Sequence, residues 1–194
     1  MNFAEYNVKD ANLEEILLAL KSLDTVEAVA LGGSRSTGAS DENSDYDIYI
    51  YCAEIPTAET RENLLGKYCS IAEFGNHYWE SEDNTVMNNG IPVDIIYREV
   101  DRFGRYIDTV IKGGKAFNGY TTAFWHNIKN SKVLFDKTGT FTKFRDMAQI
   151  DFPENLRSAI IKNNRNLLNG KLPSYDRQIK KAQERGDIVS VNHR

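Results

Sequence analysis

Two short strands separated by a loop of small polar residues form the most constraining stretch of this chain. Residues 26–31 (VEAVAL) are almost entirely apolar and two glycines end them, which is typical of a buried strand. Residues 45–52 (DYDIYIYC) alternate in character and are rich in Tyr and Ile, which indicates a second strand. The segment between them, residues 32–44 (GGSRSTGASDENS), predicts a loop with one helical turn near its start. This unit favours a fold built on a sheet.

The second strand carries two carboxylates on one face. Because side chains alternate along a strand, Asp45 and Asp47 project to the same side, with Tyr49 and Tyr51 further along it. Two carboxylates this close repel each other, so the pair needs a cation, a shared proton or water. Hard oxygen ligands suit Mg²⁺, which proteins hold with one or two carboxylates together with substrate phosphates.

The loop before these carboxylates suits a phosphate, and a later aspartate extends the acidic cluster. The glycines at 32 and 33 allow close approach of the backbone, and the Ser34 hydroxyl with the amides of the next turn can bind phosphate oxygens. Asp94 lies in residues 91–97 (IPVDIIY), where a lone carboxylate is costly to bury unpaired. It is explained if it faces the same cation from a neighbouring strand. A structural ion pair with Arg98 or with a lysine is the alternative.

The rest of the chain is predicted as helices, one hairpin and a basic C-terminal stretch. Asn12 is the expected N-cap of the first helix, and Asn-Gly at 89–90 favours a tight hairpin turn. The predicted elements are helices over 12–23, 57–73 and 99–112, a hairpin over 85–97, a short apolar run at 133–135, and helices from 153 to about 186; residues 115–130 are ambiguous. Residues 157–185 hold eight basic and two acidic residues, which indicates a solvated helix face or a surface that binds an anionic ligand.

Several side chains have a structural and a functional interpretation. His77 and His126 are expected to be packing or surface residues rather than ligands. The aromatic residues of two segments are expected in the core, with a wall that stacks on a base or an acceptor ring as the alternative; they are Phe74, Tyr78, Trp79, Tyr120, Phe124 and Trp125.

Composition and charge disfavour several classes of protein. The 194 residues carry a formal net charge of −4, which disfavours sequence-independent binding to a nucleic-acid duplex. The two cysteines, Cys52 and Cys69, have no metal-binding spacing and predict neither a disulfide framework nor a zinc site. The acidic N-terminus has no leader pattern, and no apolar run approaches the roughly 20 residues that span a bilayer. We therefore expect a soluble cytoplasmic protein without a membrane partner, and the oligomeric state stays open.

These motifs together resemble the DNA polymerase β-like nucleotidyltransferase superfamily, and more narrowly the small bacterial nucleotidyltransferase-domain proteins that include antibiotic adenylyltransferases. The pattern is Gly33-Ser34, then Gly38, then Asp45 and Asp47, then Asp94. Many members have an arginine just before the second glycine, where this chain has Thr37 and a basic residue only at Arg35. The resemblance covers residues 25–100.

The resemblance implies an α/β (α+β) fold, with a small mixed, mostly antiparallel sheet flanked by helices and a helical C-terminal region. It implies a catalytic domain over residues 1–100 and a mostly helical region over 101–194, for which truncation at the C-terminal end is an open interpretation.

The resemblance also implies an enzyme that transfers a nucleoside monophosphate, expected to be AMP, from an NTP, expected to be ATP, to an acceptor hydroxyl. Two Mg²⁺ ions would be held by Asp45, Asp47 and Asp94, and the nucleotide by Gly33, Ser34, Arg35 and Ser36. Asp94 would alternatively act as general base. Pyrophosphate is the leaving group, and the acceptor is a small drug-like molecule or a protein side chain.

Two other functions remain open from the sequence. One is a non-catalytic module of the same fold that binds nucleotide or another protein; the three retained carboxylates argue against it because their mutual repulsion serves no purpose there. The other is a polymerase that extends a nucleic-acid end, which the acidic net charge disfavours.

Overall fold

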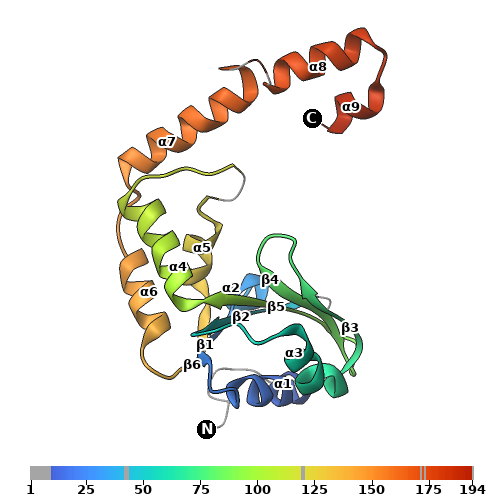
Figure 1. The fold of residues 1–194 in the computed structure, drawn as a ribbon, viewed down its shortest axis with the longest axis vertical. Helices are drawn as coiled ribbons and strands as arrows, with labels where there is room; N and C mark the ends of the chain where they lie inside the picture. The colour runs from blue at the N-terminus through green and yellow to red at the C-terminus, as the bar shows by residue number, and fades with distance from the viewer. Residues whose placement is uncertain (1–9, 42–43, 119–120, 171, 173, 194) are drawn as a thin grey trace. The chain divides into compact units, whose positions relative to one another are not determined.

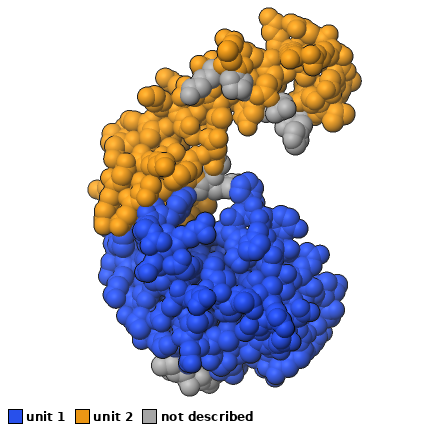
Figure 2. All heavy atoms as spheres, viewed as in Figure 1, with its two compact units in different colours: residues 1–107, 125–149 blue, residues 108–124, 150–194 orange. Residues whose placement is uncertain are grey.

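The computed structural model describes residues 10–41, 44–118, 121–170, 172 and 174–193. The chain divides into two compact units, which Figure 2 distinguishes by colour. Unit 1 comprises residues 1–107 and 125–149, and unit 2 comprises residues 108–124 and 150–194. The division into domains at residue 100 stays a prediction.

Unit 1 is built on a six-stranded sheet with the strand order β3-β4-β5-β2-β1-β6. The strands are β1 (Val26–Leu31), β2 (Tyr46–Cys52), β3 (Cys69–Asn76), β4 (Ser81–Met87), β5 (Pro92–Glu99) and β6 (Lys132–Asp136). Only β2 and β5 pair in parallel, and every other neighbouring pair is antiparallel. This confirms the predicted mixed, mostly antiparallel sheet. The hairpin expected over 85–97 is also confirmed, with longer strands.

One face of the sheet is covered by α1 (Ala11–Lys21) and α3 (Ala58–Leu65), as Figure 1 shows. Leucine and isoleucine side chains of α1 pack with the buried side of β1, β2 and β5 to form the hydrophobic core. The N-cap of α1 is Asp10 rather than the expected Asn12. The Asp10 carboxylate accepts hydrogen bonds from the amides of Asn12 and Leu13. Asp10 therefore satisfies two backbone donors of the first turn, which a cap at Asn12 would not do.

The helix predicted over residues 57–73 was wrong in its second half. After α3 the chain makes a 3₁₀ turn, η2 (Gly66–Tyr68), and then forms the edge strand β3. No side chain of β3 is fully buried, so the strand carries no apolar alternation that the sequence could reveal. Pairing with β4 decides its conformation.

The opposite face of the sheet is covered by α4 (Val100–Ile107), α5 (Ala123–Asn130) and α6 (Thr140–Ala148) (Figure 1). Tyr51 of β2 contacts three phenylalanine rings there, at centroid distances of 5.3–5.8 Å; they are Phe103, Phe141 and Phe144. The helix predicted over 99–112 is confirmed, with a π turn, η3 (Asp108–Lys112), as its last part. The ambiguous segment 115–130 contributes α5.

Unit 2 is helical, which confirms the expected helical C-terminal region. Besides η3 it contains α7 (Glu154–Arg165), the π turn η4 (Asn166–Gly170), α8 (Tyr175–Glu184) and α9 (Ile188–His193). These C-terminal helices bury few side chains, chiefly Leu156 and Ala182. None of the helices in the described part of the chain is long and apolar enough to cross a membrane.

The aromatic residues expected in the core do not all lie there. Phe124 and Trp125 are buried, as predicted. Tyr78 and Trp79 lie in the β3–β4 connection with relative exposures of 71% and 81%, so their assignment to the core was wrong. Phe74 is partly buried, and Tyr120 lies outside the described residues.

Candidate active site

The glycine–serine loop connects β1 to a single short helix beside β2. The amide of Gly32 donates to the carbonyl of Asp47 at 2.8 Å, which ties the end of β1 to β2. The helix, α2 (Gly33–Thr37), follows at once and ends at Gly38, whose φ is +79°. The Ser36 hydroxyl donates to the Gly33 carbonyl at 2.8 Å. The predicted helical turn near the start of the loop is therefore present.

Gly33 is the position where the loop approaches the carboxylates. Its φ is +60°, and a Cβ built on it would lie 1.7 Å from an Oδ atom of Asp47. Any side chain at this position would collide with that carboxylate, and the positive φ would add strain. The absence of a side chain at Gly33 thus allows the Asp47 carboxylate to lie against the loop.

The predicted carboxylates gather on one part of the sheet. Asp47 of β2 and Asp94 of β5 are direct partners in the parallel register, and both are partly buried. Asp45 lies just before β2 and is exposed. Burial, and after it the charges of Asp45 and Asp94, raise the pKa of Asp47 from 3.8 to about 6. The three groups therefore form one electrostatically coupled acidic cluster.

The donor chemistry of this cluster fits a hard divalent cation. All three groups are carboxylates, and a bound cation would relieve the repulsion that disfavours the ionised form of Asp47. Within residues that the structure describes, no three acidic, histidine or cysteine side chains already converge as a complete ligand set. The fit thus rests on charge and donor type.

Arg35 is engaged by the backbone of its own loop. Its guanidinium donates to the carbonyls of Ser44 and Asp45 and lies 4.1 Å from the ring centre of Tyr46. These contacts hold the end of the loop, immediately before Asp47. A role for Arg35 in binding nucleotide stays a prediction.

A cavity of about 190 Å³ lies beside α2 within unit 1. Its lining is polar and comes from the loop and from the end of α5: Gly33, Ser34, Ser36, Thr37, His126, Asn127, Asn130 and Ser131. The wall from α5 was not predicted, because nothing in the spacing of residues 126–131 relates them to a loop almost a hundred positions earlier. His126 is exposed, as expected of a surface residue, and it lines this cavity.

Tyr49 connects the two walls of this cavity. Its hydroxyl accepts a hydrogen bond of 2.8 Å from the side-chain amide of Asn127. Its ring lies so close to Gly32 that a Cβ there would be 2.4 Å from a ring carbon. Burial raises the pKa of Tyr49 to about 12, so the hydroxyl stays protonated at neutral pH.

The alternative ion pair between Asp94 and Arg98 is wrong. Arg98 is buried and forms a two-pronged pair with Glu80, with N–O distances of 2.8 and 2.7 Å. Asp94 instead accepts a hydrogen bond of 2.9 Å from the side-chain amide of Asn84. The Asp94 carboxylate therefore has a neutral partner.

Comparison with known proteins places these motifs in a family. The family described as nucleotidyltransferase domain matches residues 13–117, which is more than half of the chain and includes the three aspartates. No curated protein matches the chain. Among solved structures, one titled "Structure of Cid1 in complex with its short product ApU" is similar, with 20% sequence identity and a TM-score of 0.38; the match covers 54% of this chain and 32% of that chain. On the strength of the family match, the chain belongs to the nucleotidyltransferase domain family.

Proposed function

We propose that this chain is a Mg²⁺-dependent nucleotidyltransferase that transfers AMP from ATP to an acceptor hydroxyl and releases pyrophosphate. One observation carries the proposal: Asp47 and Asp94 are register partners, and the Asp47 carboxylate lies against the glycine–serine loop. A family whose domains transfer nucleotides supplies the reaction class. The choice of ATP and AMP rests on the resemblance to the antibiotic adenylyltransferases.

The proposed nucleotide site is the polar cavity beside α2. Gly33, Ser34 and Ser36 line it. The Ser36 hydroxyl and amide donate to the carbonyls of Gly33 and Gly32, so the amides of Gly33 and Ser34 and the Ser34 hydroxyl are the donors proposed for phosphate oxygens. Arg35 is proposed to act near the phosphates by holding the loop, through its contacts with the carbonyls of Ser44 and Asp45.

Asp45, Asp47 and Asp94 are the proposed ligands of two Mg²⁺ ions. When bound, Mg²⁺ supplies charge for the phosphates and lowers the pKa of an acceptor hydroxyl. The acceptor oxygen then forms a bond to the α-phosphorus, and the bond from that phosphorus to the bridging oxygen breaks with loss of pyrophosphate. Asp94 is the carboxylate proposed to receive the hydroxyl proton. The acceptor is proposed to be a small molecule or a protein side chain.

The experiment measures pyrophosphate release with each of the four NTPs and Mg²⁺ against a panel of hydroxyl acceptors. The test variant is Asp45→Asn/Asp47→Asn, and Asp24→Asn is the matched control because Asp24 is exposed and precedes β1. We expect release with ATP that one acceptor stimulates, that the double variant loses and that Asp24→Asn retains.

Two other results are informative. Transfer that prefers another NTP would replace ATP and AMP in the proposal. No release and no metal-dependent binding of any NTP would contradict the enzyme and leave a non-catalytic module of the same fold.

A further inference from the structure

The edge strand β3 contains a bulge opposite β4. Glu73 pairs with Asn84 and Asn76 pairs with Glu82, so three steps along β3 match two steps along β4. The extra residue falls in the segment Phe74–Gly75. Because side chains alternate along a strand, Glu73 and Asn76 would face opposite sides without it. The bulge brings both side chains to the face of the sheet that carries Asn84.

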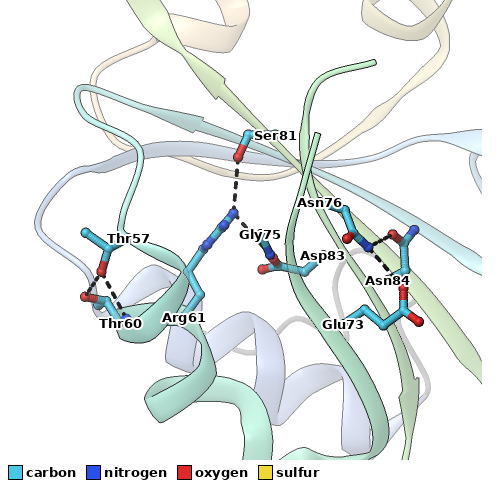
Figure 3. A network of polar contacts seen from close by, with 9 residues as sticks. All are labelled: Thr57, Thr60, Arg61, Glu73, Gly75, Asn76, Ser81, Asp83 and Asn84. Atoms are coloured by element: carbon cyan, nitrogen blue, oxygen red, sulfur yellow. Dashed lines mark hydrogen bonds and ion pairs between the residues drawn. The ribbon is translucent and has the colours of Figure 1, made fainter. Parts of the chain in front are cut away.

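A buried ion pair anchors the bulge from the other face (Figure 3). Gly75 has a φ of +83°, and its amide donates to the Asp83 carboxylate at 2.9 Å. Asp83 is fully buried and pairs with the buried Arg61 at 3.4 Å. The Arg61 guanidinium also lies 4.4 Å from the ring centre of Tyr97. The core thus fixes the position of the bulge.

On the opposite face, a chain of hydrogen bonds runs from the bulge to Asp94. The amide nitrogen of Asn76 donates to Asn84 Oδ1 at 2.7 Å and to Glu73 Oε2 at 3.3 Å (Figure 3). The amide nitrogen of Asn84 donates to Asp94 Oδ1 at 2.9 Å.

The direction of this chain is determined by its two ends. An ionised carboxylate only accepts hydrogen bonds, so the nitrogen of Asn84 must face Asp94 and its oxygen must face Asn76. Asn76 then has to present its own nitrogen to Asn84, and its second hydrogen goes to Glu73. Each amide therefore has one orientation that satisfies its neighbours.

One row across four strands contains Glu73, Asn84, Asp94 and Asp47. Glu73 is the partner of Asn84 in the β3–β4 register, Asn84 is the partner of Asp94 in the β4–β5 register, and Asp94 is the partner of Asp47 in the β5–β2 register. The row thus leads from the bulge at the sheet edge to the acidic cluster.

We infer that Asn84 is the positioning residue of Asp94, oriented in turn by Asn76 and the bulge; this inference rests on the proposed function for the role of Asp94. The hydrogen bond from Asn84 occupies one oxygen of the carboxylate and fixes its plane, so the other oxygen is presented to the metal and the acceptor. Groups that orient a metal ligand in this way are commonly worth about 10- to 100-fold in activity or metal affinity.

The test compares Asn84→Ala and Asn76→Ala with Asn88→Ala. Asn88 is the matched control, because it is an exposed asparagine in the β4–β5 turn whose side chain donates one bond of 3.0 Å to the Lys67 carbonyl. We expect Asn84→Ala to lower kcat about 10- to 100-fold with the KM for NTP nearly unchanged. Asn76→Ala should give a smaller loss of kcat, and Asn88→Ala should retain the wild-type kcat. Thermal unfolding of each variant reports whether it folds.

Two readouts do not depend on activity. In ¹H–¹⁵N spectra, Asp94→Ala should move the side-chain amide signals of Asn84 and leave those of Asn88 in place. The Mn²⁺ affinity of the nucleotide-free protein should fall about tenfold or more in Asn84→Ala and stay unchanged in Asn88→Ala.

The outcomes separate this inference from the proposed function. If the wild type transfers no nucleotide but the amide shift and the loss of Mn²⁺ affinity are observed, the positioning role stands and the proposed reaction does not. The positioning role is overturned if Asn84→Ala behaves like Asn88→Ala in kcat and Mn²⁺ affinity. It is also overturned if the side-chain amide signals of Asn84 stay in place in Asp94→Ala, whatever the activity of the wild type.

Discussion

The folded structure disfavours the ionised form of Asp47. Its pKa is raised from 3.8 to about 6, first by burial and then by the charges of Asp45 and Asp94. Such a group lowers the stability of the folded protein wherever it is ionised. The cost is present above the folded-state pKa of about 6 and disappears as the pH falls toward the unfolded-state value.

Asp47→Asn should therefore stabilise the metal-free protein at pH 8. A pKa displaced this far corresponds to at most about 3 kcal/mol, and partial exposure of the side chain reduces the expected gain to about 1–2 kcal/mol. The gain should shrink between pH 6 and pH 4. Urea denaturation at pH 8 and pH 4.5 measures both values, with Asp24→Asn as the exposed control. A gain that is equal at the two pH values would contradict this origin.

Gly33 and Gly38 form a matched pair for testing why the loop needs glycine. Both have positive φ, at +60° and +79°. A Cβ on Gly33 collides with the Asp47 carboxylate, whereas a Cβ on Gly38 meets nothing within 4 Å.

Gly38→Ala should cost only the backbone strain, about 1 kcal/mol, with activity retained. Gly33→Ala should add displacement of the Asp47 carboxylate and lose at least about tenfold in kcat/KM. Steady-state kinetics with thermal unfolding of both variants checks this. Equal kinetic losses in the two variants would show that backbone strain alone matters.

At the level of elements, the connection between β3 and β4 matters through Glu80. This carboxylate is the ionic partner of Arg98 on β5, which is buried and also donates to the Tyr51 hydroxyl at 3.1 Å. Removing the charge of Glu80 leaves a buried guanidinium without its counter-charge.

Glu80→Gln should destabilise the protein by about 2–3 kcal/mol, the scale of a hydrogen bond to a charged group. Glu82→Gln is the control on the adjacent strand. Burial and the charges of Asp94, Glu80 and Asp83 raise the pKa of Glu82, so its neutralisation should be neutral or mildly stabilising. Denaturation at pH 7 distinguishes the two, and equal effects would mean that the Glu80–Arg98 pair contributes little.

The strands differ in how strongly their sequences indicate them. The strands on either side of the glycine–serine loop were predicted because both faces of β2 carry information: Tyr46, Ile48 and Ile50 lie in the core, and Asp47 lies on the opposite face. The edge strand β3 was missed because it buries no side chain completely. Its bulge was equally hidden, since register depends on the partner strand.

At the level of the whole molecule, the family match and the unit boundaries differ in extent. The match ends at residue 117, whereas unit 1 also includes residues 125–149. Those residues supply β6, which pairs with β1, and Phe141 and Phe144, which cover Tyr51.

A domain that ends at residue 100, as predicted, would fold within a chain of residues 1–117. The pairing of β1 with β6 leads to the opposite expectation. We expect residues 1–117 to lack a cooperative unfolding transition, because β1 loses β6, one of its two neighbouring strands, and an aromatic cluster is exposed. Residues 1–149 should unfold cooperatively. Near-ultraviolet circular dichroism and urea titration of both fragments decide the matter, and cooperative unfolding of residues 1–117 would support the division at residue 100.

The sequence by itself determined the local parts of this protein. It indicated the glycine–serine loop, the strand that places Asp47 opposite the core, and the isolated Asp94, because each depends on residues a few positions apart. The tertiary structure decided which strands meet. Only the parallel pairing of β2 with β5 makes Asp47 and Asp94 neighbours. Only the packing of residues 126–131 beside the loop gives the cavity its second wall. The same holds for Asn84. Nothing in its sequence context distinguishes it, and only the register of β4 with β5 brings its side-chain amide to the Asp94 carboxylate.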